Sequence, residues 1–89
     1  MVLLDVLGKR WALRILWELR DQTVTFRELR RQCDDISPTS LNNRLKELRE
    51  LNLVTHDDGG YKLTEQGKEL GEHILGLSKW AENWDKPTN

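Results

Sequence analysis

Apolar residues recur at three- and four-residue steps in four stretches of the chain, which is the spacing of helices with one buried face. The first stretch runs from about Val2 to Arg20, and Gly8 is expected to bend it or to split it in two. The second begins at Phe26, the third runs from Pro38 to about Leu51, and the last runs from Glu65 to about Trp84. The pattern predicts a mostly α-helical protein.

Between the third and fourth helical stretches, the pattern changes to short runs that favour β-strands. Leu53–His56 and Tyr61–Leu63 flank a turn at Asp57–Gly60, which predicts a β-hairpin, and Val24 is expected to form a very short strand. The order helix, short strand, helix, turn, helix, hairpin, helix is that of a winged helix-turn-helix domain. We therefore predict one domain over residues 1–89, with a helix-turn-helix at 26–51, a wing at 53–63 and candidate dimerisation helices at 1–20 and 65–86.

Polar residues mark where three of these helices begin. Thr25 followed by Glu28 has the form of a capping box, in which the hydroxyl accepts a hydrogen bond from one backbone N–H and the carboxylate reaches back to another. Ser37 before Pro38 is a second N-cap signal, and Thr64 is a third. These signals support a helix, turn and helix over residues 26–51.

The third helix has an apolar side and a polar side. Leu41, Leu45 and Leu48 share one side and are expected to face the core. The polar side offers amides that can pair with adenine, hydroxyls, and cations that can bind phosphate or guanine. The alternative is the solvated face of any amphipathic surface helix. The predicted DNA contacts on this helix are Thr39, Ser40, Asn42, Asn43, Arg44 and Lys46.

Basic residues outside the third helix are candidates for contact with the phosphate backbone. Arg27, Arg30 and Arg31 lie near the start and outer face of the second helix, and we select Arg27 and Arg31 as contacts. The alternative is ordinary solvated surface with local ion pairs. In the wing, Lys62 is the nearest positive charge to an acidic tip. We therefore expect the hairpin mainly to cover the core, with a peripheral backbone contact through Lys62 at most.

The charge balance alone gives weak support for binding to DNA. The 89-residue chain has a formal net charge of −1. Residues 1–50 hold ten Lys and Arg against eight Asp and Glu, whereas residues 51–89 hold four against seven, so the half with the helix-turn-helix is the basic one. No apolar run reaches the length of a membrane span and no secretory signal is evident. With a single cysteine, these features predict a cytoplasmic protein.

The residues that most often carry chemistry form no constellation here. Cys33 shares a helix face with Phe26 and Leu29, so we expect a buried thiol that acts as a small hydrophobe; a reactive sensor thiol is the alternative. His56 and His73 lie far apart without companion ligands, so neither a metal site nor a cofactor is predicted. Because catalytic motifs are also missing, we do not expect an enzyme.

Four tryptophans are many for a domain of this size, and all lie in the terminal helices. Large apolar residues that one small core cannot hide often form an interface. We expect a two-fold dimer that places two third helices about 34 Å apart, one turn of DNA. The alternative is that some of these residues complete the monomer core, Trp11 first among them. The predicted dimer residues are Leu4, Leu7, Ile74, Leu77, Trp80 and Trp84.

A series of short motifs also follows a fixed order along the chain: Gly8-Lys9-Arg10-Trp11, Ile15-Leu16 and Leu19, Phe26-Arg27-Glu28-Leu29, Ile36-Ser37, Leu41, Arg44-Leu45, Leu48, Leu53-Val54, Tyr61-Lys62-Leu63-Thr64 and Gly67. Over about residues 4–84 the chain thereby resembles the HxlR family of bacterial and archaeal winged-helix regulators, which is related in architecture to MarR-like proteins. The resemblance implies a dimeric transcription factor whose third helix enters the major groove and whose first and last helices form the dimer. Some members respond to electrophiles or oxidants, but this chain lacks their cysteine ahead of Gly8, and its wing is shorter.

We therefore predict a sequence-specific regulator that binds double-stranded DNA as a homodimer on a pseudo-palindromic operator. A winged helix used only for protein contact is one alternative, and it predicts no salt-dependent association with duplex DNA. A ligand- or redox-sensing switch is another, and it requires a pocket or a reactive thiol.

Overall fold

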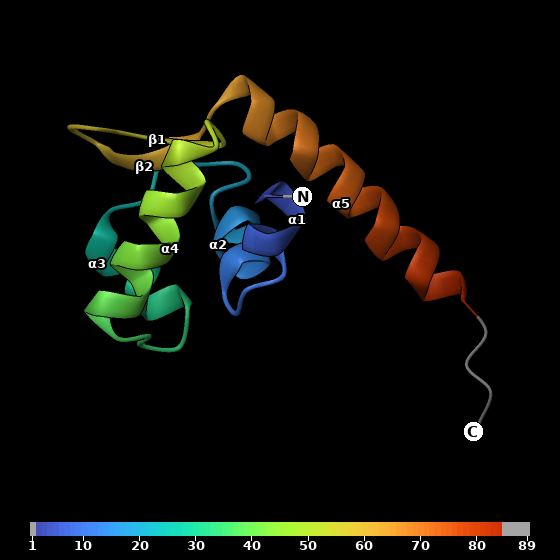
Figure 1. The fold of residues 1–89 in the computed structure, drawn as a ribbon, viewed down its shortest axis with the longest axis horizontal. Helices are drawn as coiled ribbons and strands as arrows, with labels where there is room; N and C mark the ends of the chain where they lie inside the picture. Colours follow the sequence, from blue (N-terminus) through green and yellow to red (C-terminus); the bar gives the residue numbers. More distant parts are fainter. Residues whose placement is uncertain (1, 85–89) are drawn as a thin grey trace.

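The structure is a computed structural model that describes residues 2–84. It contains five helices and one hairpin, in the predicted order, within this part of the chain (Figure 1). Helices α2, α3 and α4 form the body with the hairpin along one edge, and α5 leads away from it. The elements are α1 (Val2–Leu7), α2 (Ala12–Glu18), α3 (Phe26–Gln32), α4 (Pro38–Glu50), β1 (Val54–Asp57), β2 (Gly60–Leu63) and α5 (Glu65–Asn83).

The first helical stretch is split, which is one of the two outcomes expected at Gly8. Helix α1 ends at Leu7, and α2 begins after Trp11, whose backbone has a φ of 78°. This left-handed conformation is uncommon for a large side chain, and it turns the chain sharply between the two helices. Trp11 packs against the core as a partly buried residue, as the alternative for this tryptophan predicted.

The first strand of the hairpin lies one residue later than predicted, and the second begins one residue earlier and ends at the predicted residue. The strands are antiparallel, with Val54 opposite Leu63. Val24, where a very short strand was expected, forms an isolated β-bridge, in which its N–H and its carbonyl each form a 2.8 Å hydrogen bond with the backbone of Tyr61. Gly60 is needed at this point: its φ is 126°, and a Cβ there would lie 2.5 Å from the Val24 carbonyl oxygen.

The helix caps follow the sequence prediction with one correction. Ser37 Oγ accepts from the Ser40 N–H at 3.1 Å, and Thr64 Oγ1 accepts from the Gly67 N–H at 2.9 Å. Thr25 Oγ1 accepts from the Glu28 N–H at 3.1 Å, as expected. The second half of the capping box is wrong, because the Glu28 carboxylate binds Arg31 instead of reaching back to residue 25.

The core lies between α2, the helix-turn-helix and the hairpin. The leucines at 41, 45 and 48 are at most 1% exposed, which confirms the predicted inward side of α4. The hairpin covers the core as predicted, through buried side chains at positions 53, 61 and 63. Burial at this level stabilises each large apolar side chain by about 1.5–3 kcal/mol.

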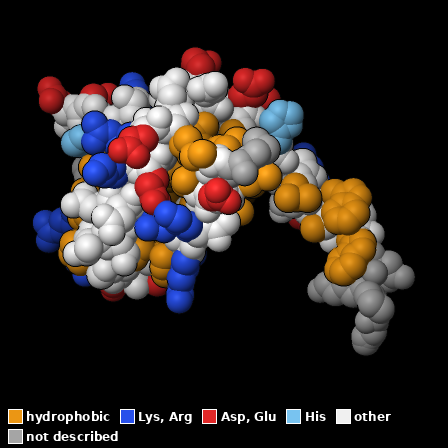
Figure 2. Space-filling view, in the orientation of Figure 1, with side chains coloured by type: hydrophobic (Ala, Val, Ile, Leu, Met, Phe, Trp, Pro, Cys, Tyr) orange, Lys and Arg blue, Asp and Glu red, His pale blue; other side chains and the backbone are white. Residues whose placement is uncertain are grey.

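Helix α5 is held against the body along its first half, where Leu70 and Ile74 are partly buried against the core. A Cβ at Gly67 would collide with the Leu53 carbonyl oxygen, so the two backbones are in close contact there. Farther along, α5 extends past the body, and Leu77, Trp80 and Trp84 are 63%, 61% and 54% exposed (Figures 1 and 2). Residues 85 and 86, at the end of the predicted dimerisation helix, lie outside the described residues. Among residues 2–84, no helix combines the length and apolar character needed to cross a membrane.

Candidate nucleic-acid interface

Helix α4 presents a polar face that no other element within residues 2–84 covers. The predicted contacts Thr39, Ser40, Asn42, Asn43 and Lys46 are all exposed, opposite the buried leucines. The Ser37 cap and Pro38 in the first turn hold the start of this helix. Amides, hydroxyls and a cation therefore stand on one rigid helix, which is the arrangement that reads bases and phosphates in a major groove.

Arg44 differs from the other predicted contacts on α4. Its side chain is 20% exposed, and its Nε lies 3.2 Å from Glu47 Oε1. Glu47 Oε2 also accepts a hydrogen bond from Lys9 Nζ at 2.6 Å. The Lys9 hydrogen bond lowers the pKa of the Glu47 carboxyl, and the nearby Arg44 charge lowers it further. One flank of α4 is thus tied to the connection between α1 and α2.

The three arginines of α3 have different surroundings. Arg31 donates to both carboxylate oxygens of Glu28, at 2.5 and 2.6 Å, and this contact lowers the pKa of Glu28. Arg30 Nε donates to the Ile36 carbonyl at 2.7 Å and braces the turn before α4. Arg27 is exposed and makes no ion pair with another described residue. Arg27 is therefore the member of this group with its charge available.

The hairpin tip has mostly internal interactions. Asp57 Oδ1 accepts from the Gly59 N–H at 2.8 Å, and Lys62 Nζ lies 3.4 Å from Asp57 Oδ2. The Gly59 hydrogen bond and then Lys62 lower the pKa of Asp57. The charge of the predicted contact Lys62 is therefore partly neutralised by Asp57 of the neighbouring strand.

Arg49 is an exposed cation on α4 that the sequence analysis did not select. It lies two turns after Asn42, on the same flank of the helix, and it lines one hollow with Asn42, Asn43 and Lys46. The seven-residue spacing from Asn42 was the signal that could have identified it.

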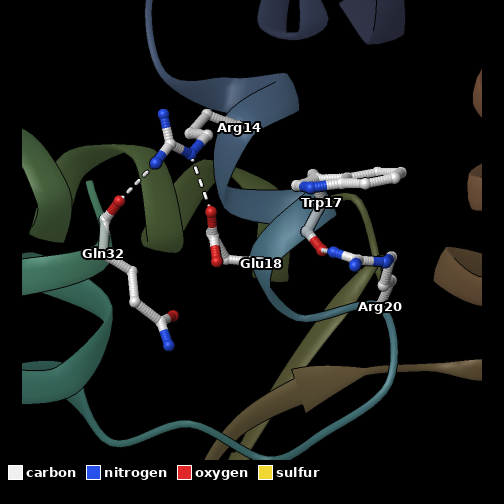
Figure 3. Close-up of polar contacts among 5 residues, drawn as sticks. All are labelled: Arg14, Trp17, Glu18, Arg20 and Gln32. Atoms are coloured by element: carbon white, nitrogen blue, oxygen red, sulfur yellow. Dashed lines mark hydrogen bonds and ion pairs between the residues drawn. The ribbon is translucent and has the colours of Figure 1, made fainter. Parts of the chain in front are cut away.

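Helix α2 braces the helix-turn-helix from behind. Arg14 Nη2 donates to the Gln32 carbonyl at the end of α3 at 2.6 Å, and Arg14 Nε binds Glu18 at 2.8 Å (Figure 3). On the other side of α2, the Arg20 guanidinium lies 3.7 Å from the centre of the Trp17 ring. Of these contacts, the Arg14–Gln32 hydrogen bond links α2 directly to the end of α3.

Cys33 is fully buried, as expected from its helix face. Burial raises the pKa of its thiol to about 11, which keeps it protonated and weakly reactive near neutral pH. Within residues 2–84, acidic, cysteine and histidine side chains form no group of three that could hold a metal ion.

The predicted dimer residues divide into two groups. Leu4, Leu77, Trp80 and Trp84 are exposed, and the rings of Trp80 and Trp84 stack with centres 6.4 Å apart. Leu7 and Ile74 are partly buried against the monomer core. The structure also exposes large apolar side chains that the sequence analysis did not select, namely Val2, Leu13, Trp17 and Leu75.

Comparison with known proteins identifies the family. HxlR-like helix-turn-helix proteins match over residues 6–89. The chain is 32% identical over 88 residues to MJ0925 of Methanocaldococcus jannaschii, an uncharacterized HTH-type transcriptional regulator, with 94% of this chain and 83% of that protein covered. It is 33% identical over 91 residues to YvaP of Bacillus subtilis, of the same description, with 94% and 84% covered.

A solved structure shows the same fold. The quinone-bound form of YodB from B. subtilis superposes with a TM-score of 0.85 at 33% identity, over 92% of this chain and 93% of that chain. The winged helix-turn-helix prediction is thereby confirmed. The relatives are regulators, which implies a role without catalysis. The chain belongs to the HxlR-like helix-turn-helix family, and it is a transcriptional regulator with a DNA-binding helix-turn-helix domain.

Proposed function

We propose that the protein acts as a homodimer on a pseudo-palindromic operator, with α4 of each protomer in the major groove. The observation that carries this proposal is the division of α4 into a buried leucine side and an uncovered polar side. A two-fold dimer would present two such helices to successive major grooves, about 34 Å apart. This role agrees with the cytoplasmic location expected from the sequence.

The dimer is supported by the apolar residues of α5 that the monomer leaves in solvent. Trp80 and Trp84 form a stacked pair beyond the body, with Leu77 also exposed nearby on the helix. Burying an aromatic side chain removes about 150–250 Å² from water, so two such pairs would contribute a large share of a stable interface. Helix α1 adds Leu4 to the exposed apolar surface.

The candidate contacts have distinct roles in this proposal. Asn42 and Asn43 would read base edges, and Thr39 and Ser40 would contact bases or phosphates near the start of α4. Lys46 and Arg27 bring charge to phosphates. Three other candidates already have carboxylate partners and would have to leave them to bind DNA: Arg31, Arg44 and Lys62.

Selection of bound sequences from a random duplex pool tests the proposal. We expect an enriched site with two-fold symmetry and half-sites one turn of DNA apart. Asn43→Ala should cost about 1–3 kcal/mol at the selected site and relax the preference at one position of each half-site. Ser78→Ala, a substitution of an exposed residue on α5, is the control.

Two results would contradict the proposal. An asymmetric site bound by one protomer would exclude the dimer on a pseudo-palindrome. The absence of salt-dependent binding to any duplex at low ionic strength would instead favour the protein-contact module.

A further inference from the structure

A cleft runs between α4 and the hairpin. It consists of two adjoining hollows of about 440 and 390 Å³, and Lys46 and Arg49 line both. The larger hollow faces the polar side of α4. We call this larger hollow the wing cleft. It is lined by Asn42, Asn43, Leu45, Lys46, Arg49 and Tyr61.

The wing cleft is positively charged. Its lining includes two cations and no carboxylate, whereas Glu50 contributes to the neighbouring hollow only. Neither Lys46 nor Arg49 forms an ion pair with any other residue between positions 2 and 84. This sets them apart from Arg44, on the opposite flank of α4, which lies beside Glu47. In a chain with a net charge of −1, two adjacent unpaired cations favour an anionic ligand.

The hairpin side of the wing cleft is already held in place. Tyr61 is bonded to Val24 through both backbone groups, and its ring stacks on His56 with centres 4.1 Å apart and an angle of 12° between the planes. Phe26 of α3 contacts the same ring, with centres 6.4 Å apart. The rigid aromatic wall and the helical wall would therefore need little rearrangement to receive a ligand.

We propose that the wing cleft binds one phosphodiester of the DNA backbone, with Arg49 as its principal cation and Lys46 beside it. The proposal rests on the proposed function, since α4 must approach a duplex for the cleft to be filled. It is favoured by charge complementarity and by continuity with the polar face of α4, because Asn42, Asn43 and Lys46 belong to both surfaces. The hairpin, expected to do little beyond covering the core, becomes one wall of a backbone-binding site.

The test combines Arg49→Ala with operator duplexes in which single phosphodiesters are replaced by uncharged methylphosphonates. With wild-type protein, we expect about tenfold weaker binding when the replacement falls at the contacted position in each half-site. Arg49→Ala should weaken binding to all duplexes by a similar factor and lower the salt slope by about 0.9 for each phosphate that it leaves without a cation. The variant should also become insensitive to that one methylphosphonate while remaining sensitive to replacements at other positions.

Two further variants make the result specific. Lys79→Ala removes one exposed positive charge from the distal half of α5 and should leave the salt slope unchanged. Arg49→Lys keeps the charge and should recover most of the slope. Thermal unfolding of each variant shows that a loss of affinity is not a loss of fold.

The outcomes separate this proposal from the function on which it rests. If Arg49→Ala binds like wild type while Asn43→Ala loses affinity, α4 reads DNA and the wing cleft is not a phosphate site. If Arg49→Ala remains sensitive to every methylphosphonate to which wild type responds, the contact is also refuted. If wild-type protein binds no duplex, the proposed function itself fails.

Discussion

Helices α4 and α5 are the two longest helices between residues 2 and 84, and their apolar sides have opposite surroundings. In α4, the leucines at 41, 45 and 48 are buried within one protomer. In α5, Leu77, Trp80 and Trp84 remain more than half exposed. A helical apolar pattern therefore predicts an apolar side, but it does not tell whether residues of the same chain cover that side. The apolar side of α4 is covered within the monomer, whereas the apolar side chains in the second half of α5 are left in solvent.

The largest effect is expected from the core side of this comparison. Leu45→Ala should lower the free energy of unfolding by about 2–5 kcal/mol, because it leaves a cavity beneath α4. Chemical denaturation at a fixed protein concentration measures the loss. Glu50→Ala, on the exposed side of the same helix, should change stability by less than about 0.5 kcal/mol. Equal losses for the two variants would contradict the assigned orientation of α4.

A substitution in the distal half of α5 should affect association more than folding. Trp80→Glu should weaken the dimer by about 2 kcal/mol or more, roughly thirtyfold in the dissociation constant, because it puts a charge in an apolar interface. Sedimentation equilibrium measures the constant, with Lys79→Ala as the control. An unchanged constant, or a wild-type protein that is monomeric at micromolar concentration, would show that α5 has another partner.

The smallest effect is expected at the polar flank of α4. Glu47→Gln should cost no more than about 1 kcal/mol, since the ion pair with Lys9 is partly exposed. The pKa of Glu47 is lowered in the folded state, so its contribution is complete above the usual glutamate range and disappears as the pH falls through the folded-state value.

Measuring the free energy of unfolding against pH tests this expectation. The wild-type and Glu47→Gln curves should converge at low pH and separate as the pH rises. Glu50→Gln, which changes a carboxylate without an ion pair among the described residues, should show no such separation. A constant offset between wild type and Glu47→Gln at all pH values would show that the effect is not electrostatic.

The sequence predicts those parts of the fold that depend on neighbours along the chain. Periodicity identifies the leucine side of α4, and N-cap chemistry locates its start at Ser37. Periodicity and N-cap chemistry do not predict contacts between residues that are far apart in the sequence. Lys9 and Glu47 are 38 residues apart, and nothing in the pattern joins them. The same holds for the wing cleft, because Arg49 and Tyr61 meet only when the hairpin folds against α4.

The tight contact between the backbones of Gly67 and Leu53 helps to set the angle at which α5 leaves the body. Trp80 lies 13 residues after Gly67, about 20 Å along the helix, so a tilt of α5 by about ten degrees would displace it by roughly 3–4 Å. A methyl group added at position 67 would push the start of α5 away from Leu53 and tilt the helix relative to the body. In the proposed dimer, the angle at which the two protomers meet would therefore depend on a glycine far from the tryptophans.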